Sequence, residues 1–375
     1  METLLNVPQG TFEIQRLPYR KNEQLRAWDA ADEYLLQYLS DQGELTEESR
    51  ILILNDRFGT LALALNTFKA SAMSDSWLSQ QATRLNLSAN NLSQTAIELH
   101  NSLDWPEQQF DCVLIKVPKT LALLEDQLIR LQQLITENTT VIAAGMVKAM
   151  SATVWKLLEK YIGPTKPSLA KKKARLIFVK VEVQQQFENP YPVYYPLENT
   201  QYKICNHANV FSRESLDIGT RFLLQHLPEN TEAKDIVDLG CGNGVVGLML
   251  AESHPLSQLY FIDESYMAVA SAKENFSQAL PSRTADFSVA DGLTDFKAET
   301  MDLIVCNPPF HQQSTVGNQI ALTMFRQAHR VLRKGGNLWV IGNRHLGYHI
   351  DLKRLFTGVN EIAANKKFVI WQVKK

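Results

Sequence analysis

The chain has 375 residues and a net charge of −2, with 45% hydrophobic and 21% charged residues. This length exceeds the roughly 250 to 300 residues at which one hydrophobic core stops growing, so we expect two globular domains and no disordered chain. The four cysteines form no CxxC pair, which excludes a disulfide framework, and we expect no metal ligand set among the eight histidines. Without a signal-peptide pattern or an apolar run near about 18 residues, the sequence predicts a cytoplasmic protein with no membrane segment.

Strands and helices alternate through the first half. Residues 49–65 predict a strand, a loop and a helix, and residues 71–87 predict a strand that leads into a second helix. A further apolar strand is expected within 110–119. From 146 to 180 the chain carries nine Lys or Arg residues against one acid, and the densest cluster is Lys171, Lys172, Lys173 and Arg175. This cluster is either a solvated loop or a surface that binds phosphate.

Three prolines interrupt the periodic pattern between residues 187 and 200, where the tyrosines suggest a packed linker. We therefore place the domain boundary here and expect domains at 1–188 and 189–375. Beyond it the same elements return in the same order: strand 235–240, a glycine loop, a strand ending at Asp263, strand 301–310, a helix, strand 337–342 and a closing strand. Seven elements in one order indicate a duplication. Alternating strands and helices predict an α/β fold, with a parallel sheet and helices on both faces in each half.

The two copies differ where a ligand would lie. Asp238, Gly240, Gly242 and Gly244 stand opposite Ile53, Asn55, Arg57 and Gly59, and the segment 307–310 stands opposite 116–119. We place Asp75 opposite Asp263. An arginine in place of a glycine puts a long side chain where a ligand must touch backbone. The first copy is therefore expected to keep the fold and to have lost the chemistry.

The glycine loop with Asp238, Gly240, Gly242 and Gly244 predicts a nucleotide-like cofactor site. Glycine lets backbone approach the ligand, and Asp263 at the end of the next strand would accept hydrogen bonds from ribose hydroxyls. This pattern fits a dinucleotide as well as S-adenosylmethionine. Asp291 could meet an adenine amine or could cap its own loop.

The segment Asn307-Pro308-Pro309-Phe310 distinguishes the two cofactors. It follows an apolar strand, and the carboxyl ends of strands hold the site in open sheets of this kind. The prolines stiffen a turn that aims the Asn307 carboxamide and the Pro308 carbonyl at one point, where two acceptors suit a planar NH2 group. Phe310 would stack on the ring that carries the amine. Hydride transfer needs none of these features, so methyl transfer from S-adenosylmethionine is favoured.

These two motifs resemble those of the S-adenosylmethionine-dependent amino-methyltransferases. With the segment 211–228 and the degenerate first copy, the whole chain is similar to the ribosomal RNA guanine-N2 methyltransferases, and more to the large-subunit enzymes than to the small-subunit ones. The resemblance implies two tandem class I methyltransferase domains, Rossmann-like and with the N-terminal one degenerate. It assigns the glycines and Asp238, Asp263 and Asp291 to the cofactor, and Asn307 to Phe310 to a target guanine.

The resemblance implies a guanine in 23S ribosomal RNA as the substrate. Lys171, Lys172, Lys173, Arg175 and Arg344 would bind RNA, which makes the first domain an RNA-binding platform. Four alternatives stay open: 16S ribosomal RNA, a protein glutamine amide, a DNA adenine, or a non-catalytic RNA-binding scaffold. Because two fused copies already supply the surface of a dimer, we expect a monomer.

Overall fold

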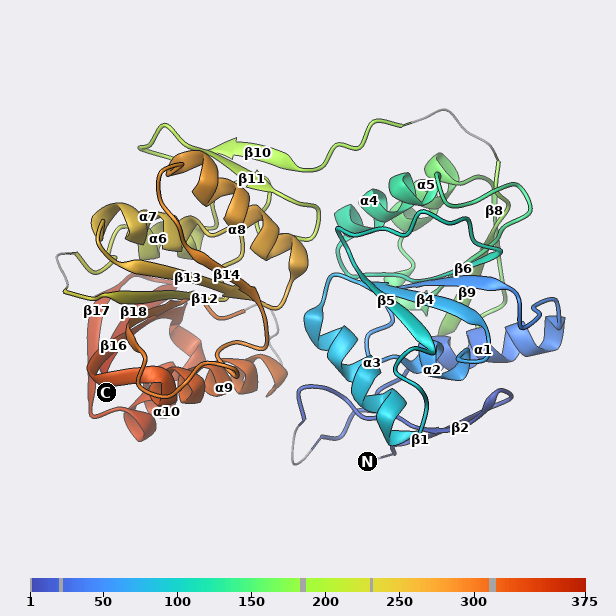
Figure 1. Cartoon of the computed structure of the whole chain (residues 1–375), viewed down its shortest axis with the longest axis horizontal. Helices are drawn as coiled ribbons and strands as arrows, with labels where there is room; N and C mark the ends of the chain where they lie inside the picture. The colour runs from blue at the N-terminus through green and yellow to red at the C-terminus, as the bar shows by residue number, and fades with distance from the viewer. Residues whose placement is uncertain (1, 20–22, 183–186, 230–231, 310–314) are drawn as a thin grey trace. The chain divides into compact units, whose positions relative to one another are not determined.

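The computed structural model describes residues 2–19, 23–182, 187–229, 232–309 and 315–375. The chain divides into two compact units, Met1–Tyr191 and Pro192–Lys375, within the proline-rich segment. In each unit, helices cover both faces of a central sheet (Figure 1). None of the helices described is both long enough and apolar enough to span a membrane.

The described part of the first unit contains one seven-stranded sheet. Its strands, in spatial order, are β5 (Ile97–Asn101), β4 (Lys69–Ser74), β3 (Arg50–Leu54), β6 (Cys112–Lys116), β7 (Thr140–Met146), β9 (Ala174–Val179) and β8 (Thr165–Pro167). Its helices are α1 (Ala30–Gln42), α2 (Thr60–Ala64), α3 (Trp77–Ala89), α4 (Leu121–Leu131) and α5 (Ala152–Tyr161). A short hairpin of β1 (Leu4–Val7) and β2 (Gly10–Glu13) precedes them.

The second unit repeats this order. The sheet found in its described residues runs β14 (Asp286–Val289), β13 (Gln258–Asp263), β12 (Asp235–Leu239), β15 (Met301–Cys306), β16 (Leu332–Asn343), β18 (Phe368–Lys374) and β17 (Gly358–Ala364). Its helices are α6 (Ile218–Leu224), α7 (Val245–Ser253), α8 (Tyr266–Ala279), α9 (Thr315–Val331) and α10 (Tyr348–Leu355). A hairpin of β10 (Val193–Pro196) and β11 (Lys203–Asn206) stands in front of α6.

The expectation of fully parallel sheets is wrong for one strand in each unit. The first five strands of each spatial order pair in parallel, but β18 runs antiparallel to both β16 and β17, as β9 does to β7 and β8. Only a short turn separates β17 from β18, and a turn of that length can join only antiparallel neighbours. The α/β fold with two tandem Rossmann-like units is confirmed.

The strand pattern explains how each sheet buries two faces. Side chains alternate along a strand, so in β3 Ile51 and Ile53 join the core under α1, α2 and α3, while Leu52 and Leu54 join the core under α4 and α5. In β12, Ile236 packs with α7 and α8, and Val237 packs with α9 and α10. A continuous apolar strand covered by helices on both sides is typical of such sheets.

Strand register fixes which residues of the two copies correspond. In the first sheet Leu54 pairs with Ile115, and in the second Leu239 pairs with Cys306. Lys116 therefore corresponds to Asn307, as the sequence predicted.

The placement of Asp75 opposite Asp263 is wrong by one residue. Met73 pairs with Leu54 as Ile262 pairs with Leu239, so Ser74 holds the place of Asp263. The first copy therefore lacks this carboxylate and has Asn55 and Arg57 in place of Gly240 and Gly242, while Gly59 is kept at the place of Gly244.

Candidate functional site

The glycine loop joins β12 to α7 and requires glycine in two different ways. Gly240, Gly242 and Gly244 have φ values of 73°, 53° and 76°, in the left-handed region that side chains disfavour. A Cβ on Gly244 would lie 2.6 Å from the Cβ of Ala272 on α8, so this glycine allows the loop to pack. A Cβ on Gly242 would meet nothing within 4 Å among the residues that the structure describes. Gly242 therefore presents bare backbone to open space, where a ligand can approach.

Two carboxylates hold this loop in place. Asp238 Oδ2 accepts from the N–H of Gly247 at 2.7 Å, and Asp263 Oδ2 accepts from the N–H of Gly242 at 2.9 Å. Burial raises the pKa of Asp238 to about 8, helped by the charge of Asp263, while the bond from Gly247 lowers it. Asp238 is buried beneath the loop. Its described hydrogen bond is with the first turn of α7, whereas the half-buried Asp263 bonds to Gly242 of the loop.

Asp291 follows β14, the strand next to Asp263 in the sheet. Its carboxyl group makes no hydrogen bond or ion pair to the residues that the structure describes, although its backbone carbonyl accepts from Gln327 and Thr294. Burial, followed by the charge of Asp295, raises the pKa of Asp291. The side chain is half-buried and carries no capping bond, so the loop-cap alternative receives no support from its contacts.

Asn307 lies beside the glycine loop, because Cys306 pairs with Leu239 and each chain then leaves the sheet at the same edge. Its amide nitrogen donates to the hydroxyl of Thr220 at 3.0 Å. Its Oδ1 is buried and has no hydrogen-bond partner in the described chain. An unpartnered buried acceptor costs about 1 to 3 kcal/mol, and such a cost is often maintained for a ligand. Pro308 is buried and Pro309 is exposed. Phe310 lies outside the described residues.

Sequence reasoning missed a set of asparagines that supports the loop. Asn243 donates to Asn206 at 2.9 Å and to the hydroxyl of Tyr195 at 3.0 Å. Asn275 on α8 donates to the backbone oxygens of Asn243 and Cys205. The β10–β11 hairpin is thereby fastened to the glycine loop. Buried asparagines at 206, 243 and 275 were the available signal, since this residue type is rarely buried without a structural reason.

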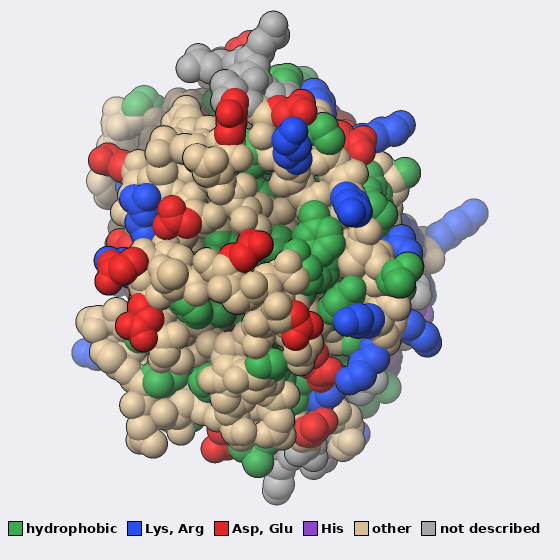
Figure 2. Space-filling view, turned by 90° about the vertical axis from the view of Figure 1, so that its right-hand side faces the viewer, with side chains coloured by type: hydrophobic (Ala, Val, Ile, Leu, Met, Phe, Trp, Pro, Cys, Tyr) green, Lys and Arg blue, Asp and Glu red, His purple; other side chains and the backbone are tan. Residues whose placement is uncertain are grey.

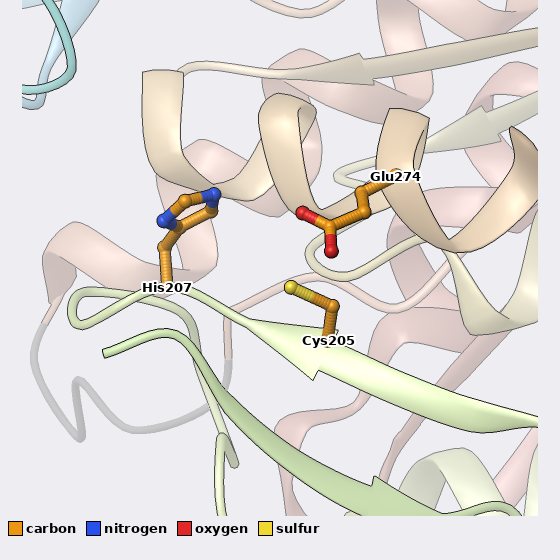
Figure 3. Close-up of side chains that lie close together, drawn as sticks. All are labelled: Cys205, His207 and Glu274. Atoms are coloured by element: carbon orange, nitrogen blue, oxygen red, sulfur yellow. The ribbon is translucent and has the colours of Figure 1, made fainter. Parts of the chain in front are cut away.

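Cys205, His207 and Glu274 form a cluster that sequence spacing did not indicate. Figure 3 shows Cys205 and His207 on the β11 segment facing Glu274 of α8, and their potential ligand atoms lie within 4.8 Å of one another. Burial, followed by the hydrogen bond to Glu274, raises the pKa of the Cys205 thiol to about 12. Glu274 also accepts from Tyr194 and Gln278, and we interpret the cluster as a hydrogen-bonded link between β11 and α8.

The predicted basic cluster forms a tight turn before β9. Lys172 and Lys173 have φ values of 47° and 63°, and Lys171 bridges to Ala174. Because Ala174 pairs with Met146 at the end of β7, this turn lies at the carboxyl edge of the first sheet.

Two lysines of the basic turn already contact other side chains of the first unit. Lys172 pairs with Glu33 at 3.0 Å, and the ammonium group of Lys171 lies 4.7 Å from the centre of the Tyr34 ring. Lys173 is exposed, whereas Arg175 is half-buried with its Nε unpartnered in the described chain. Figure 2 shows Lys and Arg side chains gathered toward the right-hand edge of the view, with acidic side chains among them.

Arg344 lies at the corresponding edge of the second sheet. It directly follows β16, its backbone N–H donates to the carbonyl of Lys367, and its guanidinium donates to the carbonyl of Asn365 at 3.0 Å. The side chain is exposed. Basic residues therefore lie at the carboxyl edge of both sheets. These are Lys171, Lys172 and Lys173 before β9 in the first unit, and Arg344 after β16 in the second.

In the first copy, charged groups occupy the corresponding positions. Lys116 forms ion pairs with Asp32 at 2.6 Å and Asp29 at 3.0 Å. Arg57 is exposed at the place of Gly242. Ile53 replaces the loop-holding Asp238, and Asp56 instead accepts from the backbone N–H groups of Thr60 and Ala62. The described part of the first copy thus keeps the helix start but presents no bare backbone at the place of Gly242.

The sheet order, the glycine loop and the polar group at the end of β15 define a methyltransferase domain. In agreement, residues 201–372 match the family model described as "Methyltransferase small domain", and residues 2–183 match "RLMG N-terminal domain". A solved structure, "T. Thermophilus 16S rRNA N2 G1207 methyltransferase (RsmC) in complex with AdoMet and Guanosine", shares the fold with a TM-score of 0.78. It is 19% identical, and the match covers 100% of this chain and 97% of that one.

Two curated relatives are similar over their full length. The "Ribosomal RNA large subunit methyltransferase G" of Ectopseudomonas mendocina is 49% identical, over 99% of this chain and 100% of the relative. The protein of the same name from Pseudomonas aeruginosa is 48% identical over the same shares. The chain belongs to the ribosomal RNA large subunit methyltransferase G family. The resemblance predicted from the motifs is confirmed.

Proposed function

We propose that the protein transfers a methyl group from S-adenosylmethionine to the exocyclic N2 amine of a guanine in 23S ribosomal RNA. The observation that carries this proposal is the buried, unpartnered Oδ1 of Asn307 beside the glycine loop. An acceptor maintained without a partner suits an amine that arrives with the substrate. The relatives at 48% and 49% identity, named for the large ribosomal subunit, support the choice of 23S RNA.

The residues present fit S-adenosylmethionine. The open space over Gly242 lets the ligand approach backbone, and the adjacent Asp263 offers a carboxylate to ribose hydroxyls. The Asp291 carboxyl group is available for an adenine amine. When bound, this cofactor supplies an electrophilic methyl carbon attached to a positively charged sulfur.

The chain's own task is to orient the accepting nitrogen. Asn307 Oδ1 and the Pro308 carbonyl would each accept one N–H of the guanine amine, which draws its nitrogen out of conjugation with the ring. The nitrogen lone pair would then be free to form a bond to the methyl carbon that the cofactor supplies, and the sulfur would keep the electrons of the broken bond. The methylated amine would lose one proton to water. Phe310, outside the described residues, is proposed to stack on the base.

A paired guanine cannot reach this edge of the sheet, so the target must be unpaired or flipped out of its helix, at a cost of a few kcal/mol when paired. Phosphate contacts would supply binding energy. We assign them to the basic turn of the first unit, with Lys171, Lys172, Lys173 and Arg175, and to Arg344 of the second. The first unit would then act as the RNA-binding platform.

Methylation assays with labelled S-adenosylmethionine test the proposal. The substrates are protein-free 23S RNA, protein-free 16S RNA, assembled ribosomal subunits, adenine-containing DNA and a release factor. We expect label in 23S RNA, mapped by mass spectrometry to one N2-methylguanine. Label in 16S RNA alone, in DNA or in protein would replace the proposed substrate. Cofactor binding without transfer to any substrate would support the scaffold alternative.

A further inference from the structure

The start of α6 contacts the end of β15 through three side chains. Asp217 is the N-cap of α6, and its Oδ2 accepts from the backbone N–H of Thr220 at 2.9 Å and from the Thr220 hydroxyl at 3.4 Å. The same hydroxyl accepts from the Asn307 amide nitrogen at 3.0 Å. Thr220 is buried, with 7% of its surface exposed. These bonds form a chain from a carboxylate to the proposed acceptor of the target amine.

The chemistry of each group fixes the direction of this chain. An ionised carboxylate only accepts, so the single proton of the Thr220 hydroxyl is donated toward Asp217. The hydroxyl oxygen can then only accept from Asn307, and an Asn side chain meets this demand with its NH2 end. Consequently Oδ1 faces the opposite way, where it is buried without a partner in the described chain. With its amide reversed, Asn307 would offer an NH2 group to the target amine, and two donors would face each other.

The first unit holds charged residues at the same three places. Asp29 is the N-cap of α1, Asp32 is the third residue of that helix, and Lys116 corresponds to Asn307 by strand register. The Lys116 ammonium group bonds to both carboxylates, at 3.0 and 2.6 Å. The contact between helix start and strand end is thus a repeated feature of the fold. In the first copy, ion pairs satisfy all three side chains. In the second copy, Asn307 Oδ1 remains without a partner in the described chain.

We propose that Asp217 and Thr220 are positioning residues for methyl transfer, which act by holding Asn307 with its oxygen toward the target amine. This role rests on the proposed function, because it presupposes that an amine binds at Asn307. The Thr220 hydroxyl contributes to orientation and not to cofactor binding. Its loss therefore lowers kcat and leaves cofactor affinity unchanged.

The main test compares Thr220→Val with Thr220→Ser. Valine matches the shape of threonine but lacks the hydroxyl, and serine restores the hydroxyl without the methyl group. We expect Thr220→Val to lower kcat by about 10- to 100-fold with an unchanged cofactor Kd, because a misoriented reacting group costs up to about 100-fold. Thr220→Ser should stay near the wild-type kcat. Thr357→Val, which removes an exposed hydroxyl bonded to the carbonyl of Lys374, is the matched control and should change nothing.

Asp217→Asn tests the direction of the chain without removing the helix cap, since its amide oxygen still accepts from the Thr220 N–H. We expect a reduced kcat, because the carboxylate no longer forces the hydroxyl proton away from Asn307. If Thr220→Val does not fold, Asp217→Asn takes its place in the test. Full activity of Thr220→Val, or of Asp217→Asn in its place, would overturn the positioning role. Equal losses in the Val and Ser variants would assign Thr220 to packing and overturn it too.

All variants are compared on whichever amine substrate the wild-type chain methylates. If that substrate is not a guanine of ribosomal RNA, the proposed function fails, and the comparison among variants still decides the positioning role.

Discussion

Lys116 and Asn307 occupy the same position in the two sheets. Lys116 follows Ile115, which pairs with Leu54 of β3, and Asn307 follows Cys306, which pairs with Leu239 of β12. Lys116 forms two ion pairs, whereas Asn307 Oδ1 has no hydrogen-bond partner in the described chain. The two copies therefore share the fold and differ in the side chains at this edge, where Lys116, Ile53 and Ser74 stand in place of Asn307, Asp238 and Asp263.

Lys116→Asn should destabilise the first unit. The substitution leaves Asp29 and Asp32 near one another without a counter-charge, and breaking such a pair costs roughly 3 kcal/mol, the low end of the usual range because Asp29 is partly exposed. Hydrogen–deuterium exchange of α1 and β6 in the full chain measures the effect. Lys119→Asn, at an exposed position on the same segment, is the control. Equal protection in both variants would contradict a stabilising ion pair.

Asn307→Ala should bind cofactor as the wild type does and lose about 10²- to 10³-fold in kcat, because it removes an acceptor at the reacting nitrogen. Single-turnover transfer and calorimetric binding of S-adenosylmethionine separate the two effects. Asn360→Ala, an exposed asparagine on β17, serves as the control. Undiminished transfer by Asn307→Ala would exclude this residue from the chemistry.

The glycines at 242 and 244 should respond differently to alanine. Gly244→Ala brings a Cβ within 2.6 Å of Ala272 and strains a left-handed backbone, so we expect a loss of about 2 to 4 kcal/mol in stability. Gly242→Ala meets no neighbour within 4 Å and should cost only about 1 kcal/mol, while weakening cofactor binding about 10-fold or more. Thermal unfolding and binding measured on both variants check this pair. A reversed order would place the ligand elsewhere on the loop.

The stability of the second unit should depend on pH through Asp238. Burial raises its pKa from 3.8 to about 8, so between these values the folded state holds a proton that the unfolded state has lost. This contribution is complete below about pH 4 and disappears as the pH rises through about 8. Asp238→Asn cannot titrate, and its stability relative to the wild type should therefore increase from pH 5 to pH 9. Denaturant unfolding at several pH values measures this trend, and a constant difference would contradict the raised pKa.

Replacing Lys171, Lys172 and Lys173 with serine should weaken RNA binding most at low salt. Each lost phosphate contact reduces the slope of log affinity against log salt by about 0.7 for single-stranded RNA. Cofactor binding should not change. A triple variant with serine at Lys69, Lys297 and Lys273 changes the net charge equally at other positions. If both triple variants lower the slope alike, the basic turn has no special role.

The strands and helices with a strong apolar pattern could be predicted from sequence. The strand at 50–54 and the glycine loop follow from local pattern, whereas β17 did not, because most of its side chains are exposed at the sheet edge. The β10–β11 hairpin was also not predicted, because the prolines around β10 interrupt the periodic pattern. Asp75 was placed one residue off because polar residues at 74 and 75 look alike until the register is known.

Sequence reasoning could identify only part of the site. Asn307 and the glycines belong to short motifs, but Thr220 lies 87 positions from Asn307, and Asn206 lies 37 positions from Asn243. Such partners meet only through the fold. No local period or spacing connects them.

In the first unit, Asp56 of the loop holds the start of α2, whereas in the second unit Asp238 of β12 bonds to the start of α7. Replacing Asp56 would release the backbone N–H groups of Thr60 and Ala62, and replacing Lys116 would leave Asp29 and Asp32 without a counter-charge. Single substitutions that make the first loop resemble the second are therefore expected to destabilise the first unit before they create a ligand site.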